Sequence, residues 1–522
     1  MGIYISLNVS KSVTAEEWKP VYEKSLLMAQ KAGLYDIGFR MIHGERINCI
    51  YMTEEIVPDD EKDEIRQRRY TGWSAVGSIP SYCRAETQFM PKYTRGNEEG
   101  EKTDALLSIV SDSDDELWWQ VWGNKTQGEP YHMVLLAIGC MAEQELGIQA
   151  IVDGDITYGQ CVSAARLASE LLETEIKPPI RCCWIEFADR VKNLKGLDDT
   201  GKLEFLMQYY LGRKDNNMGE YIRSHFSDDV ILSFWQKRFQ NIKINTYGFQ
   251  DEMKTFFLLG YDLSLFCSII NLDRNDTEQC KQFINIVLNS SMHIRDKNCA
   301  DIMDLSESSQ PYGIYSVLAS IVFRGAKNPA IDRHIPIDEM REVFSRCFGN
   351  VVDVNSVINE YLNKAEPSDQ EATHQKFTSM IEKQLDDEEE KYEEYDICDY
   401  KDLVQFSPEC RIHPKMTEAL KKSFEFYCSM AERDACQEML TKSADDMFHY
   451  LAKESQGRVY YLTEIQWNKI YDELHRDSSA FKRYYPMVCV KVNGDLEYIT
   501  RAFVGDDLFW NYCCSHFLNC NN

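Results

Sequence analysis

Two carboxylates that follow a short apolar run are the residues best placed to do chemistry. Asp153 and Asp155 come directly after residues 150–152 in the sequence AIVDGDIT. A run this short between two helical patterns predicts an interior strand of a parallel or mixed sheet, and residues two apart on a strand share a face. Open α/β sheets bind ligands beyond the carboxyl ends of their strands. The pair could therefore hold Mg²⁺, which takes oxygen ligands.

Residues 150–157 resemble the first motif of the haloacid-dehalogenase-type phosphotransferases, in which an apolar strand precedes Asp-x-Asp-x-Thr. The resemblance implies that Asp153 is the nucleophile, that Asp155 is the acid and base, and that Mg²⁺ is the cofactor. It covers eight of 522 residues, lies in mid-chain, and departs from the family because Ile156 follows Asp155 where glycine is expected. The alternative interpretation is a strand-end turn in which Asp155 and Thr157 serve the start of the next helix.

Helices are expected on both sides of this turn. The apolar residues are nearly continuous over 133–141, which predicts a helix buried on most sides, and Gly147 is typical of a helix C-terminus. Thr157 and Gln160 have the spacing of a capping box, so the second helix is expected to begin at Tyr158. Helix, strand and helix in succession predict a layered α/β core.

The N-terminal residues predict a strand, a helix and a hairpin. Residues 3–9 alternate apolar and polar types, and a helix over 15–32 follows a second capping box at Thr14 and Glu17. Two strands at 37–43 and 46–52 flank Gly44 and contribute the candidate core residues Phe39, Met41, Ile47 and Ile50. This order indicates an α+β or α/β fold for a first domain over residues 1–176.

Three further features in this domain could do chemistry or build the core. Cys161 lies in the first turn of the helix after Asp155, where the helix dipole can activate a thiol, but among 18 cysteines one near a helix start is expected by chance. Ser74 lies among glycines without the spacing of a nucleophile elbow, which indicates a loop with a packed Trp73. Three tryptophans, at 118, 119 and 122, fall at helical spacing and are expected in the core.

From residue 177 onward the strand signals fade after Pro178 and Pro179, and an irregular helical domain is expected over 177–365. Asp276 and Gln279 have capping spacing ahead of one of its helices. The predicted helices span residues 185–195, 201–212, 218–240, 250–270, 276–291, 313–324, 337–348 and 355–364.

Residues 366–399 carry a dense acidic run, which predicts a linker or a solvated helix end. Helices are expected after it at 413–431, 433–454 and 463–475. Asn493 and Gly494 stand between two β-rich runs at 485–492 and 496–504, which is the pattern of a hairpin with a tight turn. The segment 400–522 is therefore expected to be helical and to close with a β-hairpin.

Charge and cysteine usage narrow the class of protein. The formal net charge of −28 repels phosphate backbones and anionic lipids, so general nucleic-acid binding and membrane insertion are not expected. The 18 cysteines include no Cys-x-x-Cys pair, and Met1 is followed by an alternating apolar segment without a basic region. These observations indicate a cytoplasmic protein with free thiols.

We therefore expect a non-catalytic, cytosolic, bacterial protein that regulates or binds another protein, without a cofactor. By charge, that partner would be a basic one. One alternative is a Mg²⁺-dependent phosphohydrolase or phosphotransferase that uses Asp153 and Asp155 as catalytic and metal-binding residues. A second alternative is an acidic inhibitor of a basic toxin or of a nucleic-acid enzyme.

Overall fold

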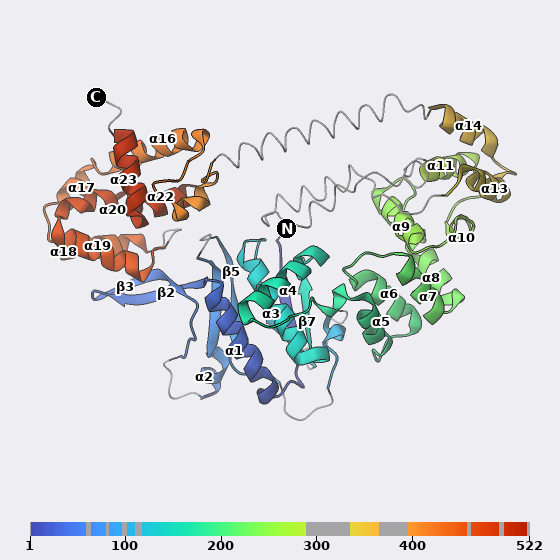
Figure 1. Ribbon diagram of the computed structural model, residues 1–522, viewed down its shortest axis with the longest axis horizontal. Coiled ribbons are helices and arrows are strands. Elements are labelled where there is room, and N and C mark those ends of the chain that lie inside the picture. Colours follow the sequence, from blue (N-terminus) through green and yellow to red (C-terminus); the bar gives the residue numbers. More distant parts are fainter. Residues whose placement is uncertain are drawn as a thin grey trace.

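Two small antiparallel sheets and a long series of helices form the protein in the computed structural model (Figure 1). The sheets lie in the middle of the molecule, with one helical region at each end (Figure 1). The structure describes residues 2–58, 64–79, 83–96, 102–109, 117–288, 335–364, 395–456, 461–489 and 495–518.

The first sheet has the strand order β6-β1-β7, with both pairings antiparallel. Its strands are β6 (Trp118–Trp122), β1 (Ile5–Ser10) and β7 (Ala150–Gly154). The expectation that β7 is an interior strand of a parallel or mixed sheet is therefore wrong, because β7 is an edge strand antiparallel to β1. The three tryptophans are buried as expected, but they belong to a strand and not to a helix.

Three helices pack together beside this sheet: α1 (Ala15–Lys31), α3 (Tyr131–Leu146) and α4 (Tyr158–Leu172). Both predicted capping boxes are present, with the Thr14 and Thr157 side chains accepting from the N–H groups of Glu17 and Gln160. Helix α3 is buried on nearly every side, as its continuous apolar sequence predicts. The local sequence thus sets where α1 and α4 begin.

The second sheet is also antiparallel, with the order β3-β2-β4-β5. Its strands are β2 (Leu34–Ile42), β3 (Glu45–Met52), β4 (Gly72–Ser78) and β5 (Arg84–Pro91). Ser74, expected in a loop, lies in β4 beside the fully buried Trp73. The short helix α2 (Glu64–Tyr70) has no buried residue and lies on the surface.

The described residues of the region after residue 177 form mainly helices, as expected. The predicted helices over 218–240 and 250–270 are each two helices, because Ser227 and Asp262 cap new helices within them. The predicted helix 313–324 lies outside the described residues. The helices are α5 (Trp184–Lys192), α6 (Asp199–Tyr209), α7 (Asn216–His225), α8 (Asp228–Gln240), α9 (Tyr247–Leu258), α10 (Leu263–Ile269), α11 (Thr277–Leu288), α13 (Ile337–Phe348) and α14 (Val354–Lys364).

The described residues of the C-terminal region form helices joined by short irregular segments. Its helices are α16 (Pro414–Met430), α17 (Asp434–Met439), α18 (Ala444–Ser455), α19 (Glu464–Arg476), α20 (Phe481–Tyr484), α21 (Pro486–Cys489), α22 (Asp495–Gly505) and α23 (Asp507–Cys513). Most of the acidic run lies in residues 365–394, outside the described part of the chain. No helix among the described residues is both long enough and apolar enough to cross a bilayer.

Helices occupy the positions where the C-terminal hairpin is predicted. Helix α21 occupies the described part of the first predicted strand and α22 occupies the second, while residues 490–494, with the Asn493-Gly494 turn, lie outside the described residues. Ile499, Ala502 and Phe503 fall at helical spacing and are buried in the C-terminal core. Burial of this face outweighs the β propensity of the segment.

Strand β7 lies between two cores. Ala150 and Val152 pack with α1, α3 and α4, whereas Ile151 points the other way into the core of helices α5–α14. Both faces of β7 are buried, which explains its continuous apolar run. An edge strand can be buried in this way because helices cover both of its faces. The N-terminal domain and the helical region share this strand.

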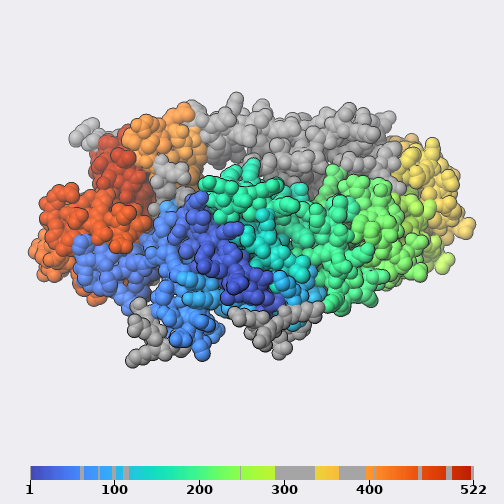
Figure 2. Space-filling model, turned by 60° about the horizontal axis from the view of Figure 1, so that its bottom comes forward, coloured from blue at the N-terminus to red at the C-terminus, as the bar shows by residue number. Residues whose placement is uncertain are grey.

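The β2–β3 hairpin belongs in part to the C-terminal core. Ile42, Ile47 and Cys49 pack among the C-terminal helices, and the Ile50 N–H donates to the Leu462 carbonyl at 2.9 Å. Figure 2 shows this N-terminal segment, in blue, against the orange and red C-terminal residues. The first and last parts of the chain are therefore packed together.

Two of the four predicted hairpin core residues are exposed. Ile47 and Ile50 are buried as predicted, but 48% of Phe39 and 68% of Met41 are exposed. Ile47 and Ile50 are three residues apart on β3, so they face opposite sides of the sheet. Phe39 and Met41 lie on the Ile50 side but nearer the turn of the hairpin, where the burial pattern leaves them uncovered.

Candidate functional site

Asp153, at the end of β7, is bound by a buried arginine. Its carboxylate pairs with the Arg181 guanidinium, whose side chain is 5% exposed, in the short turn η3 (Ile180–Cys182). The Arg181 Nε also donates to the Tyr209 carbonyl at 2.8 Å. The charge of Asp153 is thus balanced within the protein, and a cation at this carboxylate would have to compete with Arg181.

Asp155 is hydrogen-bonded to the backbone within the first sheet. Its Oδ2 accepts from the Tyr4 N–H at 2.9 Å, and its own N–H donates to the Tyr4 carbonyl at 2.9 Å. Asp153 and Asp155 therefore have different partners, and the second closes the pairing of β1 with β7. In the part of the chain that the structure describes, no group of three or more His, Cys, Asp and Glu side chains is arranged to hold a metal ion.

Glu143 on α3 is a buried carboxylate that the sequence prediction missed. Its two oxygens accept from the N–H groups of Val152 at 2.8 Å and Ile180 at 3.0 Å. Burial raises the pKa of Glu143. It joins α3 to β7 and to the turn that carries Arg181. A glutamate placed directly after a nearly continuous apolar run is a signal that could have identified it.

Neither candidate nucleophile lies at an open surface. The Cys161 side chain is fully buried, and its hydrogen bond with Cys182, together with burial, raises its pKa. The Ser74 hydroxyl donates to the Asp36 carboxylate within the second sheet. Both groups are thus committed to internal contacts, and neither faces a substrate cavity among the described residues.

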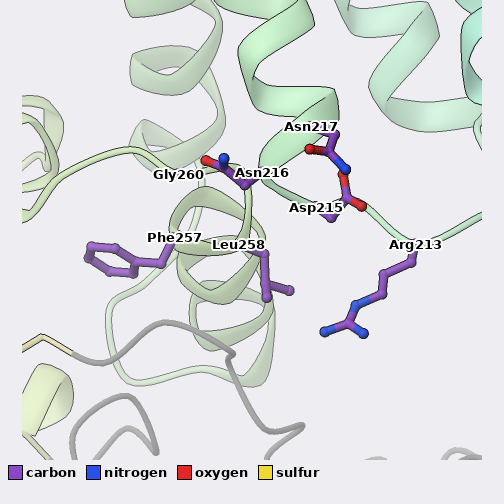
Figure 3. A pocket seen from close by; sticks show the side chains of 7 residues that line it. All are labelled: Arg213, Asp215, Asn216, Asn217, Phe257, Leu258 and Gly260. Carbon is purple, nitrogen blue, oxygen red and sulfur yellow. The ribbon is translucent and has the colours of Figure 1, made fainter.

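A hollow of about 480 Å³ lies at the start of α7 (Figure 3). Asp215 accepts from the Met218 N–H at 3.0 Å and caps α7, while the Asn216 amide donates to Glu220 at 2.8 Å. These lining groups therefore serve the helix, and the set includes no nucleophile. The hollow is lined by Arg213, Asp215, Asn216, Asn217, Phe257, Leu258 and Gly260.

The outer face of the β2–β3 hairpin, defined here as Phe39, Met41 and Arg46, carries exposed apolar side chains. Met41 is paired across the hairpin with Arg46, whose guanidinium lies 4.0 Å from the centre of the Phe39 ring. The opposite face of the same hairpin is buried in the C-terminal core. An exposed aromatic residue and methionine beside an arginine are the residue types enriched at protein interfaces.

Comparison of the chain with family models, curated proteins and solved structures finds no match. The resemblance of residues 150–157 to a phosphotransferase motif is therefore carried by those eight residues alone. The outer face of the hairpin is one described surface where residue types common at protein interfaces are exposed.

Proposed function

We propose that the protein is a non-catalytic interaction protein that binds another protein through the outer face of the β2–β3 hairpin. One observation carries the proposal. Phe39 is 48% and Met41 68% exposed on a hairpin whose other face packs Ile42, Ile47 and Cys49 into the C-terminal core. Large apolar side chains that fold neither the hairpin nor its neighbours are available to a partner.

The hairpin is held in place before any partner arrives. The His43 ring at its turn stacks on Tyr471 of α19, with 3.7 Å between ring centres and 6° between ring planes. Ile50 bridges to Thr463, which covers the outer edge of β3. A surface that is already rigid loses little conformational entropy on binding, so more of the contact energy becomes affinity.

The residues on this face indicate what the partner offers. Phe39 and Met41 fit an apolar hollow, and methionine adapts to its shape because its side chain is unbranched and flexible. The net charge of −28 attracts an overall basic protein over longer distances and speeds the encounter. The proposed partner is therefore a basic protein with an apolar contact surface.

The test compares capture of partner proteins by three forms of the full chain. We expect the wild type and an Ile65→Ala variant, which removes an apolar side chain that is 81% exposed on α2, to capture the same protein. A Phe39→Ala/Met41→Ala variant should lose at least tenfold in affinity while its circular dichroism spectrum stays unchanged.

Three results would overturn the proposal. Equal capture by the double variant would exclude the hairpin face. Self-association of the wild type in sedimentation, lost in the double variant, would replace the partner by a second copy of the chain. Capture that depends on salt but not on the hairpin face would instead favour the acidic-inhibitor alternative.

A further inference from the structure

Two cysteines from separate helices meet in the helical region. Cys267 on α10 and Cys347 on α13 are in hydrogen-bonding contact through their thiols, where the two helices pack together. Cys267 is 1% exposed, whereas Cys347 is only partly buried. One thiol is therefore accessible from solvent and the other is directly behind it.

Two arginines flank this pair. The Arg346 Nη2 donates to the Ser264 hydroxyl at 2.5 Å, and the Arg274 Nη2 donates to the Cys267 carbonyl at 2.9 Å. The hydrogen bond from Cys267 and the two guanidinium groups lower the pKa of Cys347 to about 6, and the same contact raises the pKa of Cys267. The more accessible thiol, Cys347, is therefore the more acidic of the two.

A second cysteine pair in the same protein has the opposite surroundings. Cys161 and Cys182 are also hydrogen-bonded, but both are buried. The nearby charge is the Glu143 carboxylate, and the pKa of Cys161 is raised. Contact between two thiols is thus common to both pairs, while a partly accessible thiol belongs only to the pair of Cys267 and Cys347.

We propose that Cys347 and Cys267 form a redox-active thiol pair that reacts with hydroperoxides and closes to a disulfide. The Cys347 thiolate attacks one oxygen of the hydroperoxide, the O–O bond breaks, and the leaving oxygen takes a proton to become an alcohol or water. Cys347 is then a sulfenic acid. The Cys267 sulfur attacks the Cys347 sulfur, the S–O bond breaks, and the hydroxyl leaves as water with the Cys267 proton.

Each residue has a defined role in this reaction. Cys347 is the attacking thiolate, and Cys267 resolves the sulfenic acid because it already lies in contact with it. Arg346 and Arg274 are positioning residues that stabilise the thiolate and the developing negative charge on the leaving oxygen. The disulfide joins α10 to α13, and an external thiol restores the reduced pair.

The first test measures thiol reactivity in the full-length protein. Iodoacetamide is added at pH 7 and the labelling rate of each cysteine is followed by peptide mass spectrometry. We expect Cys347 to react at least tenfold faster than Cys410, which is also partly buried. Arg346→Ala should reduce the Cys347 rate and leave the Cys410 rate unchanged. Equal rates at the two cysteines in the wild type would overturn the proposal.

The second test uses one equivalent of hydrogen peroxide. In the wild type we expect a peptide linked through Cys267 and Cys347 that dithiothreitol reverses. Cys267→Ser should leave a Cys347 sulfenic acid that dimedone traps, and Cys347→Ser should abolish both products. Cys182→Ser is the matched control and should react as the wild type does. Absence of the linked peptide in the wild type, or its persistence in Cys347→Ser, would overturn the proposal.

Discussion

At the residue scale, Arg181 is the buried partner of the predicted carboxylate Asp153. It is buried and binds both Asp153 and the Tyr209 carbonyl, so Arg181→Met leaves two polar groups without a partner. We expect a loss of about 3 kcal/mol in the free energy of unfolding, measured in urea by tryptophan fluorescence. Asp153→Asn should cost about 1–2 kcal/mol, because an amide still accepts a hydrogen bond.

The double variant of Arg181 and Asp153 decides whether the two act as a pair. A loss smaller than the sum of the single losses by about 1 kcal/mol or more shows coupling. Strictly additive losses would contradict a direct ion pair. They would also restore Asp153 as a free carboxylate that is open to other roles.

His132 gives the protein a specific sensitivity to acid. Its ring is fully buried, its Nδ1 lies 2.7 Å from the Thr126 hydroxyl, and burial lowers its pKa to about 4. The unfolded chain takes up this proton near pH 6.5. The stability that the neutral histidine contributes is therefore fully present above pH 6.5. The free energy of unfolding falls by about 3 kcal/mol as the pH decreases from 6.5 through 4.

His132→Asn tests this acid sensitivity, because asparagine keeps an acceptor for the Thr126 hydroxyl but does not titrate. We expect the melting temperature of the wild type to fall more than that of His132→Asn between pH 7 and pH 5. Parallel declines in the two proteins would assign the acid sensitivity to other groups.

The candidate site could be predicted from sequence only where its contacts are local. The turn at Thr157 was predicted correctly because a capping box is encoded within four residues. Arg181 binds Asp153 from 28 residues away, and Glu143 accepts from a strand and a turn that only folding brings together. Periodicity in the sequence does not predict contacts between residues so far apart along the chain. The partners of the predicted carboxylates are therefore known only from the structure.

At the scale of elements, the two faces of the β2–β3 hairpin have different roles. Ile47 faces the C-terminal core and Met41 faces solvent. Ile47→Ala should cost about 2–4 kcal/mol because it leaves a cavity, whereas Met41→Ala should change stability by less than about 0.5 kcal/mol. The pair is a matched comparison on one hairpin.

Hydrogen exchange locates the elements that are destabilised by Ile47→Ala. For Ile47→Ala we expect faster exchange in α18 and α19, which contact β3, although they lie some 400 residues further along the chain. Faster exchange confined to the hairpin itself would contradict the shared core.

Helices and strands were predicted correctly where a single sequence pattern determines the element. They were predicted wrongly where packing against distant residues determines the secondary structure. The helix over 337–348 has an apolar face at clear helical spacing, and α13 has the predicted bounds. The segment 496–504 is rich in β-forming residues, yet it forms α22, in which Arg501 pairs with Glu497 one turn away at 2.9 Å. Its helical face is buried against neighbours that the local sequence does not identify.

At the scale of the whole molecule, the boundaries that the sequence suggests are crossed by shared cores. Ile151 of β7 belongs to the core of the helical region, and Ile47 of the hairpin belongs to the C-terminal core. Arg190 on α5 adds a bidentate ion pair with Asp104 and a 2.8 Å hydrogen bond to the Ile148 carbonyl. Separating the chain at residue 176 or 400 would therefore expose apolar surface on both sides.

Cutting the chain tests this arrangement directly. We expect residues 1–176 to aggregate when expressed alone, because Ile151 and its neighbours lose the helices that cover them. Residues 395–522 expressed alone should unfold at a lower temperature than the same residues in the full chain. Co-expression with residues 1–394 should restore the higher unfolding temperature, because it rebuilds the contacts to Ile42, Ile47 and Cys49. A 395–522 fragment that is monomeric and as stable as in the whole protein would contradict the shared core. The exposed residues Phe39 and Met41 would then lose the rigid support that makes their face a binding surface.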